Sequence, residues 1–225
     1  MNTLIFQHIP KTAGTSLKPL VTAQFERKRS FICGSSDGVL KDFIGLKADR
    51  RNELELLFGH VDYGIHKHFN KDTKYIAFLR DPVERVVSHY YFIKFTESHR
   101  HHSTAQSMNI DEFILSGIRP RMNNCMVRMI SGINPQYGAC KDHMLDQALE
   151  NLDTHYAFVG SFSNVHESIG LLTRKMNWNP VVIERTNATK NKPDIENLPK
   201  KTLDLIRNYN ALDIKLYNLM RPKLS

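Results

Sequence analysis

Cysteine is scarce in this sequence, and it contains no long apolar run and no low-complexity stretch. The three cysteines, Cys33, Cys125 and Cys140, are far apart, and none belongs to a Cys-x-x-Cys pair. This spacing indicates neither a disulfide framework nor a zinc site. No apolar run approaches the roughly 20 residues of a membrane-spanning helix, and the first residues lack the pattern of a signal peptide. We therefore expect a cytoplasmic protein that is not stably inserted in a membrane.

The composition is that of an ordinary folded domain with a surplus of positive charge. Hydrophobic residues make up 41% and charged residues 24% of the 225, so disorder is not expected. The length suits one α/β domain, which we expect to span residues 1–225. The formal net charge is +8. This surplus favours an anionic partner such as a nucleotide, a nucleic acid, an acidic glycan or a membrane surface, or it is a basic surface without a role.

Short apolar segments alternate with amphipathic segments along the chain. Buried strands are predicted at residues 3–8, 56–58, 75–79, 157–160 and 181–183. Helices are predicted from residue 15 or 16 to 25, from 82 onward, over 110–116, 122–130 and 145–152, after Ser163, and as one helix over 200–220, whereas 95–108 is predicted to be an exposed loop. Strands that are apolar on both faces are typical of parallel sheets covered by helices. The pattern therefore predicts an α/β fold with a mainly parallel central sheet flanked by helices.

The segment Ile9–Ser16, between the first strand and the first helix, has the composition of an anion cradle. Free N–H groups at a helix start attract anions, Gly14 allows close approach of the backbone, and Lys11 adds a mobile positive charge. Thr15 and Ser16 add hydroxyl donors, and either can cap the helix. A nucleoside triphosphatase P-loop reads GxxxxGK[ST], whereas here the lysine precedes the glycine. An ATP or GTP site is therefore not indicated, and a simple capped turn with a surface lysine stays open as the alternative.

A second segment, Leu79–Tyr91, contains an arginine at a strand end and a serine on the helix that follows. Arg80 comes directly after a buried strand, at the sheet edge where open α/β folds bind ligands, and its guanidinium can form a forked pair with a phosphate. Asp81 is predicted to cap the helix with Glu84 as its capping-box partner. Ser88, two turns into the helix, can add a hydroxyl to the same phosphate. A buried strand followed by a capped helix is the alternative that involves no ligand.

Together, these two segments resemble the donor-binding motifs of one enzyme family. His8–Ser16 resembles the loop that holds the 5'-phosphosulfate of PAPS (3'-phosphoadenosine-5'-phosphosulfate) in carbohydrate sulfotransferases of the heparan sulfate 2-O-sulfotransferase type, and Leu79–Tyr91 resembles their 3'-phosphate segment. The resemblance, over about residues 3–190, implies a P-loop-kinase-like sulfotransferase fold, PAPS as sulfuryl donor, no metal, a neutral or anionic glycan as acceptor, and no nucleic-acid partner. The residues that it implies for donor binding are Lys11, Thr12, Ala13, Gly14, Thr15, Ser16, Arg80, Ser88, Thr189 and Lys190.

His60 is the expected catalytic base, and Lys11 is the expected partner of the leaving oxygen. His60 follows Gly59 at a predicted strand end, and the heparan-type enzymes have a catalytic histidine in a similar Gly-His context. They carry a second histidine two residues earlier, where this chain has Phe58, so we expect a single base and no histidine pair. His8, next to the phosphate loop, stays open as a competing base.

Other histidines and a missing acid leave further alternatives. His66 and His68 are expected either to line the acceptor side or to lie in a solvated loop. The run His99–His102 is open to three interpretations: metal binding, contact with an anionic acceptor, or an exposed loop. Soon after Gly160 the family often has an acidic residue, where residues 161–163 of this chain are Ser-Phe-Ser. The role of that acid therefore stays unassigned.

Two other functional classes compete with a sulfotransferase. A nucleotide kinase or phosphotransferase of related architecture would need a GK[ST] lysine and a magnesium-binding carboxylate at a strand end, and neither is found in the sequence. A non-enzymatic module for nucleic acid or anionic glycans would use the positive charge, but no helix-turn-helix, zinc-finger or RNA-binding signature accompanies that charge.

Overall fold

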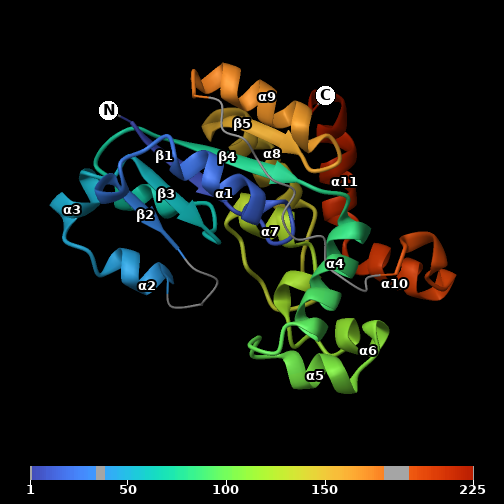
Figure 1. Ribbon diagram of the computed structural model, residues 1–225. Coiled ribbons are helices and arrows are strands. Elements are labelled where there is room, and N and C mark those ends of the chain that lie inside the picture. The colour runs from blue at the N-terminus through green and yellow to red at the C-terminus, as the bar shows by residue number, and fades with distance from the viewer. Residues whose placement is uncertain (1, 34–38, 180–192, 225) are drawn as a thin grey trace.

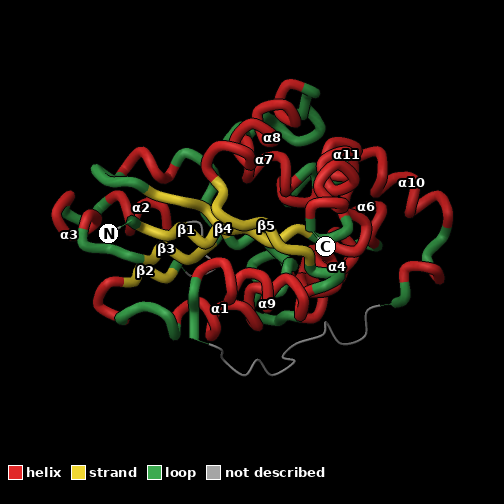
Figure 2. Tube along the Cα trace, turned by 90° about the horizontal axis from the view of Figure 1, so that it is seen from above, coloured by secondary structure: helices red, strands yellow, loops and turns green. Residues whose placement is uncertain are grey.

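The computed structural model describes residues 2–33, 39–179 and 193–224, and its centre is a five-stranded sheet. The strand order is β2-β3-β1-β4-β5, and each neighbouring pair is parallel. The strands are β1 (Thr3–Gln7), β2 (Ser30–Ile32), β3 (Leu56–Gly59), β4 (Thr73–Leu79) and β5 (Tyr156–Ser161). Helices cover both faces of the sheet (Figures 1 and 2). The predicted α/β fold with a mainly parallel central sheet is therefore confirmed.

The helices form two layers and one extension. Helices α1 (Gly14–Thr22) and α9 (Val165–Met176) cover one face of the sheet, and α7 (Cys125–Ser131) and α8 (His143–His155) cover the other (Figure 2). Helix α4 (Pro82–Phe95) leads from the end of β4 to α5 (His102–Ser107) and α6 (Ile110–Leu115) (Figure 1). The other helical segments are α2 (Val39–Ile44), α3 (Ala48–Asn52), α10 (Lys200–Tyr209), α11 (Ala211–Met220) and the 3-10 turns η1 (Arg27–Arg29), η2 (Ile65–His68), η3 (Pro120–Met122), η4 (Ile195–Asn197) and η5 (Arg221–Lys223).

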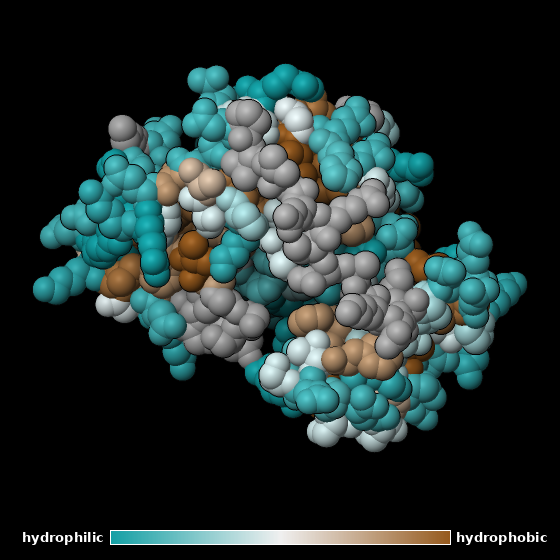
Figure 3. Space-filling view, viewed as in Figure 1, coloured by the Kyte–Doolittle hydropathy of each residue, from teal (hydrophilic) through white to brown (hydrophobic). Residues whose placement is uncertain are grey.

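Side chains of the central strands divide between two apolar layers. Leu4 and Phe6 of β1 pack with α1 and α9, whereas Ile5 belongs to the cluster on the opposite face. The ring of Phe6 stacks on Phe58 of β3 with 4.7 Å between centroids, and it lies 6.1 Å from Phe78 of β4. Three neighbouring strands are thus held by ring contacts. The face of the molecule that Figure 3 shows is mainly hydrophilic. Among the described residues, no helix is long and apolar enough to cross a membrane.

The strand register brings three segments to one edge of the sheet. Gln7 at the end of β1 pairs with Gly59 at the end of β3, so His8 and His60 leave neighbouring strands side by side. Arg80 follows β4, which is the other neighbour of β1. Carboxyl ends of parallel strands share an edge, and α/β folds place ligands there.

The predicted exposed loop at residues 95–108 is partly wrong, because it contains helix α5. Ala105 of this helix is fully buried against the apolar side of α4, where Tyr90 donates a hydrogen bond to the carbonyl of Met108 at 2.7 Å. A polar, histidine-rich composition thus concealed a short helix whose order depends on these tertiary contacts. The predicted strand at residues 181–183 lies outside the described residues.

The predicted single helix at residues 200–220 is also wrong, because it is interrupted at Asn210 between α10 and α11. The side chain of Asn210 is buried and donates to the carbonyls of Met122 and Ile206, both at 3.0 Å. Its oxygen accepts from the N–H of Asn124 at 3.0 Å. These contacts stabilise a bend that the amphipathic pattern alone does not reveal.

Helices α7 and α11 satisfy each other's first backbone N–H groups. The carboxylate of the buried Asp213 accepts from the N–H groups of Met126 at 3.0 Å and Val127 at 2.8 Å. In return, the side-chain oxygen of Asn124 accepts from Leu212 at 3.0 Å and from Asp213 at 3.1 Å. Two side chains thus satisfy four helix-terminal donors, which would otherwise be buried without partners.

Replacing Asp213 by alanine is expected to lower the free energy of unfolding by about 3 kcal/mol, because two buried N–H donors lose their acceptor. Asp204→Ala is the matched control, since the Asp204 side chain is half-exposed and forms a surface ion pair with Arg207 one turn away. Its cost should stay below about 1 kcal/mol. Urea unfolding of both variants measures the difference, and equal losses would contradict the buried role of Asp213.

Candidate functional site

The loop between β1 and α1 forms an open cradle of backbone N–H groups. Lys11 and Ala13 adopt left-handed conformations with φ of 71° and 66°, and the Thr12 hydroxyl donates to the carbonyl of Ile9 at 2.8 Å. Within the part of the chain that the structure describes, the N–H groups of residues 11–15 have no acceptor. Such a nest at a helix start, aligned with the helix dipole, binds anions.

The helix after this cradle begins at Gly14, one or two residues earlier than predicted. Neither Thr15 nor Ser16 caps it, because the cap position is Ala13, whose carbonyl accepts from the N–H groups of Ser16 and Leu17 at 3.0 and 2.9 Å. The Thr15 side chain is exposed and Ser16 is partly exposed. Both hydroxyls are therefore available to a ligand at the helix start.

Arg80 joins the two predicted phosphate motifs. It is 8% exposed, and its Nη1 donates to the backbone carbonyl of Lys11 at 3.0 Å. Its Nε and Nη2 bind the carboxylate of Glu84 at 3.2 and 3.1 Å, and the guanidinium lies 4.0 Å from the ring centroid of Phe162. Asp81 caps α4 by accepting from the Glu84 N–H at 2.9 Å, as predicted. The Glu84 carboxylate, however, accepts hydrogen bonds from Arg80 and does not complete a capping box. A phosphate bound at Arg80 would compete with this carboxylate for the guanidinium.

Helix α4 carries a row of buried polar residues on its inner face. Ser88, Arg85 and His89 are 3%, 0% and 3% exposed, and the spacing of three and four residues puts them on one side of the helix. Among the described residues, the three guanidinium nitrogens of Arg85 have no hydrogen-bond partner. The helix thus contributes positive potential beside the cradle, which favours an anionic ligand.

The amine of Lys11 lies over an aromatic ring at the entrance to the cradle. Its Nζ is 4.3 Å from the ring centroid of Phe92, which is 39% exposed. Burial, and secondly the charge of Arg80, lower the pKa of Lys11 to about 8. An anion bound in the cradle would favour the charged form of this amine.

His60 stands beside the cradle in one defined tautomer. Its Nδ1 lies 2.5 Å from the backbone carbonyl of His8. Since a carbonyl can only accept, Nδ1 carries the proton and Nε2 is left as a basic nitrogen. Burial, followed by the charge of Arg121, lowers the pKa of His60 to about 4, although its hydrogen bond to His8 acts in the opposite direction. His60 is therefore neutral at pH 7.

His8 forms a pair with His60, contrary to the expectation of a single histidine at this site. The two rings stack with 4.3 Å between centroids and 24° between planes. Burial, then the neighbouring His60, lowers the pKa of His8 well below its ordinary value. Position 58 of this chain is a phenylalanine, as the sequence shows, but His8 at the end of the adjacent strand β1 supplies the second imidazole. The only signal for this in the sequence is that both strands end one residue before a histidine.

The remaining predicted residues lie elsewhere. Nδ1 of His66 forms a hydrogen bond with the Tyr75 hydroxyl at 2.9 Å, and the His66 ring stacks on His155. The ring of His68 packs edge-on against Phe43. In the run His99–His102, the ring of His99 lies edge-on to Phe92, 6.1 Å away. No group of three or more possible metal ligands gathers among the described residues. Thr189 and Lys190 are outside the described residues.

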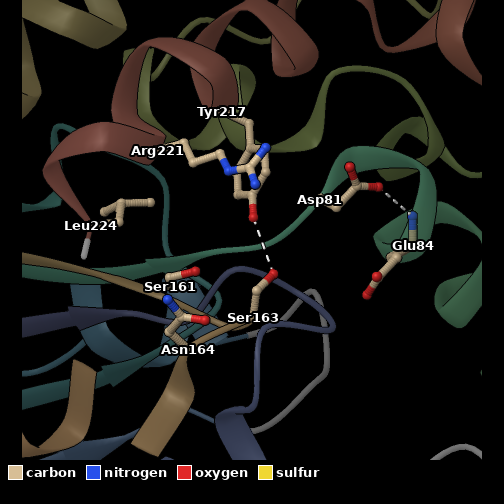
Figure 4. A pocket seen from close by; sticks show the side chains of 8 residues that line it. All are labelled: Asp81, Glu84, Ser161, Ser163, Asn164, Tyr217, Arg221 and Leu224. Carbon is tan, nitrogen blue, oxygen red and sulfur yellow. Dashed lines mark hydrogen bonds between the residues drawn. The ribbon is translucent and has the colours of Figure 1, made fainter. Parts of the chain in front are cut away.

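A polar pocket of about 310 Å³ is lined in part by Asp81 and Glu84 at the start of α4 (Figure 4). Ser161 and Ser163 stand where an acid was missing from the sequence pattern, and the Ser163 hydroxyl lies 3.1 Å from that of Tyr217. Tyr217 and Arg221 come from the C-terminal helices, so sequence spacing gave no signal for them. The lining residues are Asp81, Glu84, Ser161, Ser163, Asn164, Tyr217, Arg221 and Leu224.

Known proteins with similar sequence and fold are sulfotransferases. Residues 1–219 match the model of the Sulfotransferase family. Heparan sulfate 2-O-sulfotransferase 1 of Mus musculus and of Homo sapiens are each 25% identical to this chain over 189 residues, covering 75% of the chain and 53% of the relative. The chain thus spans about half the length of these relatives. The crystal structure of mouse sulfotransferase SULT7A1 complexed with PAP has a similar fold, with a TM-score of 0.53, 13% identity, and coverage of 98% of this chain and 85% of that one.

The lowered pKa of His60 predicts a pH dependence of stability. The folded pKa of about 4 lies below the ordinary value of 6.5, so the unfolded state binds the proton more tightly between these pH values. The free energy of unfolding should therefore be highest above pH 6.5 and should fall as the pH drops toward 4. His60→Asn keeps a donor for the His8 carbonyl but cannot titrate, so denaturant unfolding at several pH values should show a shallower slope. His166→Asn, on the exposed face of α9, should keep the wild-type slope.

Proposed function

The chain belongs to the sulfotransferase family, and from this membership we propose that it transfers a sulfuryl group from PAPS to a hydroxyl group of a carbohydrate. The observation that carries the proposal is the hydrogen bond from Arg80 to the carbonyl of Lys11, because it unites the two segments predicted to bind phosphate beside a neutral histidine. A donor with phosphates at both the 3' and 5' positions requires two such segments.

The two segments divide the donor between them in this proposal. The N–H groups of residues 11–15 and the Lys11 amine hold the 5'-phosphosulfate, since they form an open nest at the start of α1. Arg80 and Ser88 bind the 3'-phosphate, with Arg80 exchanging its contact to Glu84 for one to the phosphate. The family resemblance assigns Thr189 and Lys190 to donor binding as well, and both lie outside the described residues. PAP in the SULT7A1 complex supports this class of ligand.

The proposed reaction is an in-line displacement at sulfur. His60 Nε2 accepts the proton of the acceptor hydroxyl as the hydroxyl oxygen forms its bond to sulfur. The bond between sulfur and the 5'-phosphate oxygen breaks with its electron pair on that oxygen, where Lys11 stabilises the new charge. His60 is neutral before the reaction, and the bound anions raise its pKa from about 4 toward a value better suited to a base.

A glycan acceptor is supported by the relatives and by the charges around His60. The relatives are named as heparan sulfate 2-O-sulfotransferases. Arg121 lies against His60 with Nη2 3.4 Å from its carbonyl, and the charge of Arg119 also reaches this histidine. The formal net charge of +8 is compatible with a negatively charged polysaccharide. We propose an acceptor of this class.

Calorimetry without added metal tests the donor site. The wild type is expected to bind 3',5'-adenosine bisphosphate at least about 10-fold more tightly than AMP, because a charge-assisted contact to the 3'-phosphate adds roughly 1.5–3 kcal/mol. Arg80→Ala should remove this preference, whereas Arg207→Ala, at an exposed arginine of α10, should leave it unchanged. Equal affinities for the two nucleotides in the wild type, or tighter binding of ATP, would refute the proposal.

Transfer of 35S-labelled sulfuryl from PAPS to de-O-sulfated heparan sulfate tests the base. His60→Ala is expected to lower kcat by about 10²–10⁴-fold, the usual contribution of a general base, with the affinity for the bisphosphate nearly unchanged. His166→Ala serves as the matched control and should be fully active. Full activity of His60→Ala would exclude His60 as the base, and absence of transfer by the wild type would exclude this acceptor.

A further inference from the structure

The ring of His8 is held between the anion cradle and the proposed base. A Cβ atom at position 14 would stand 1.7 Å from Nε2, 2.0 Å from Cε1 and 2.3 Å from Cδ2 of His8. The imidazole therefore lies directly against Gly14 in the first turn of α1, a contact that only glycine permits. The Nε2 edge of the ring thus faces Gly14, and a face of the same ring stacks on His60 at 4.3 Å between centroids.

Residue 8 also holds the segment that carries His60 through its backbone. The N–H of His8 donates to the carbonyl of Gly59 at 2.8 Å. Its carbonyl accepts from Nδ1 of His60 at 2.5 Å. The backbone contacts fix the position and tautomer of His60, while the stacked ring limits how far the His60 ring can turn and how much solvent reaches it.

The charge state of His8 suits this arrangement. Burial, His60, Arg121 and Lys11 all lower its pKa, so the ring is neutral and adds no repulsion when His60 gains a proton. A cation at this position would stand under the forming imidazolium and oppose it.

We propose that His8 is a positioning residue, whose ring is wedged between Gly14 and His60 and sets where the base stands relative to the phosphosulfate cradle. The inference rests on the proposed function for its catalytic meaning, but the wedge itself is a property of the free chain. Because the His8 ring contacts both residues, a displacement of Gly14 in the cradle would displace the His60 ring as well. Misplacement of a catalytic group by about 1 Å can cost about 100-fold in rate.

Three single variants and one double variant test this wedge in the full chain. His8→Ala removes the ring and should expose His60, so that its titration midpoint, followed by long-range 1H–15N NMR, rises from about 4 toward 6.5. The acid limb of the pH–rate profile for 35S transfer should move in the same direction, and kcat should fall by about 10–100-fold. His8→Phe keeps an uncharged aromatic ring and should retain both the low midpoint and kcat within about threefold.

Gly14→Ala and Gly14→Ala/His8→Ala complete a double-mutant cycle. Gly14→Ala alone should displace the His8 ring and raise the midpoint of His60, because its Cβ would overlap that ring. In the His8→Ala background the added methyl meets no ring, so it should change the proton affinity of His60 by less than about twofold.

The outcomes separate this inference from the proposed function. If His8→Phe is as slow as His8→Ala, the imidazole nitrogens themselves are required and the positioning role is wrong. If Gly14→Ala is equally harmful with and without His8, the contact between them has no function. A wild type that neither binds the bisphosphate nor transfers sulfuryl would refute the proposed function. The NMR titration of the free chain would still decide whether His8 controls His60.

Discussion

The hydrogen bond from Arg80 to the backbone carbonyl of Lys11 is the contact on which the arrangement of the site depends. It joins residues 69 positions apart in the chain and aligns the ends of two neighbouring strands. With its carbonyl directed at a buried guanidinium, Lys11 holds a left-handed conformation that costs a non-glycine residue about 1–2 kcal/mol. The N–H groups of the loop are thereby left open on the other side. The open N–H groups of the loop and the burial of Arg80 are therefore two results of one interaction.

Local signals were sufficient to predict most of the sheet and the start of α4. The strands β1 and β4 are apolar almost throughout because both of their faces are covered, and Asp81 followed by Pro82 is a helix start that depends on neighbouring residues alone. The strand order, the break at Asn210 and the helix α5 were not predictable in this way. Each depends on contacts between segments far apart in the sequence, such as Asn210 with Met122.

In the candidate site, too, residues in local motifs were predicted, whereas contacts between distant segments were not. Gly14, Lys11 and Arg80 stand in motifs that can be recognised along the chain, and the structure brings them together. The stacking of His8 on His60 was not predicted, because the family pattern points to position 58 for a second histidine and that residue is Phe58. The parallel register of Gln7 with Gly59 makes His8 its true neighbour. The capping-box expectation for Glu84 was incomplete for a similar reason, because Arg80 competes for its carboxylate.

The central position of β1 has a consequence for the synthesis of the chain. Its five residues are synthesised before both of their partners, β3 and β4, which end at Gly59 and Leu79. Until those strands appear, Ile5 and Phe6 have no sheet to join, so an apolar segment stays exposed to chaperones during translation. The anion cradle is complete only once Arg80 has been added. Strand β1 thus reaches its final contacts only after both of its neighbours in the sheet have been made.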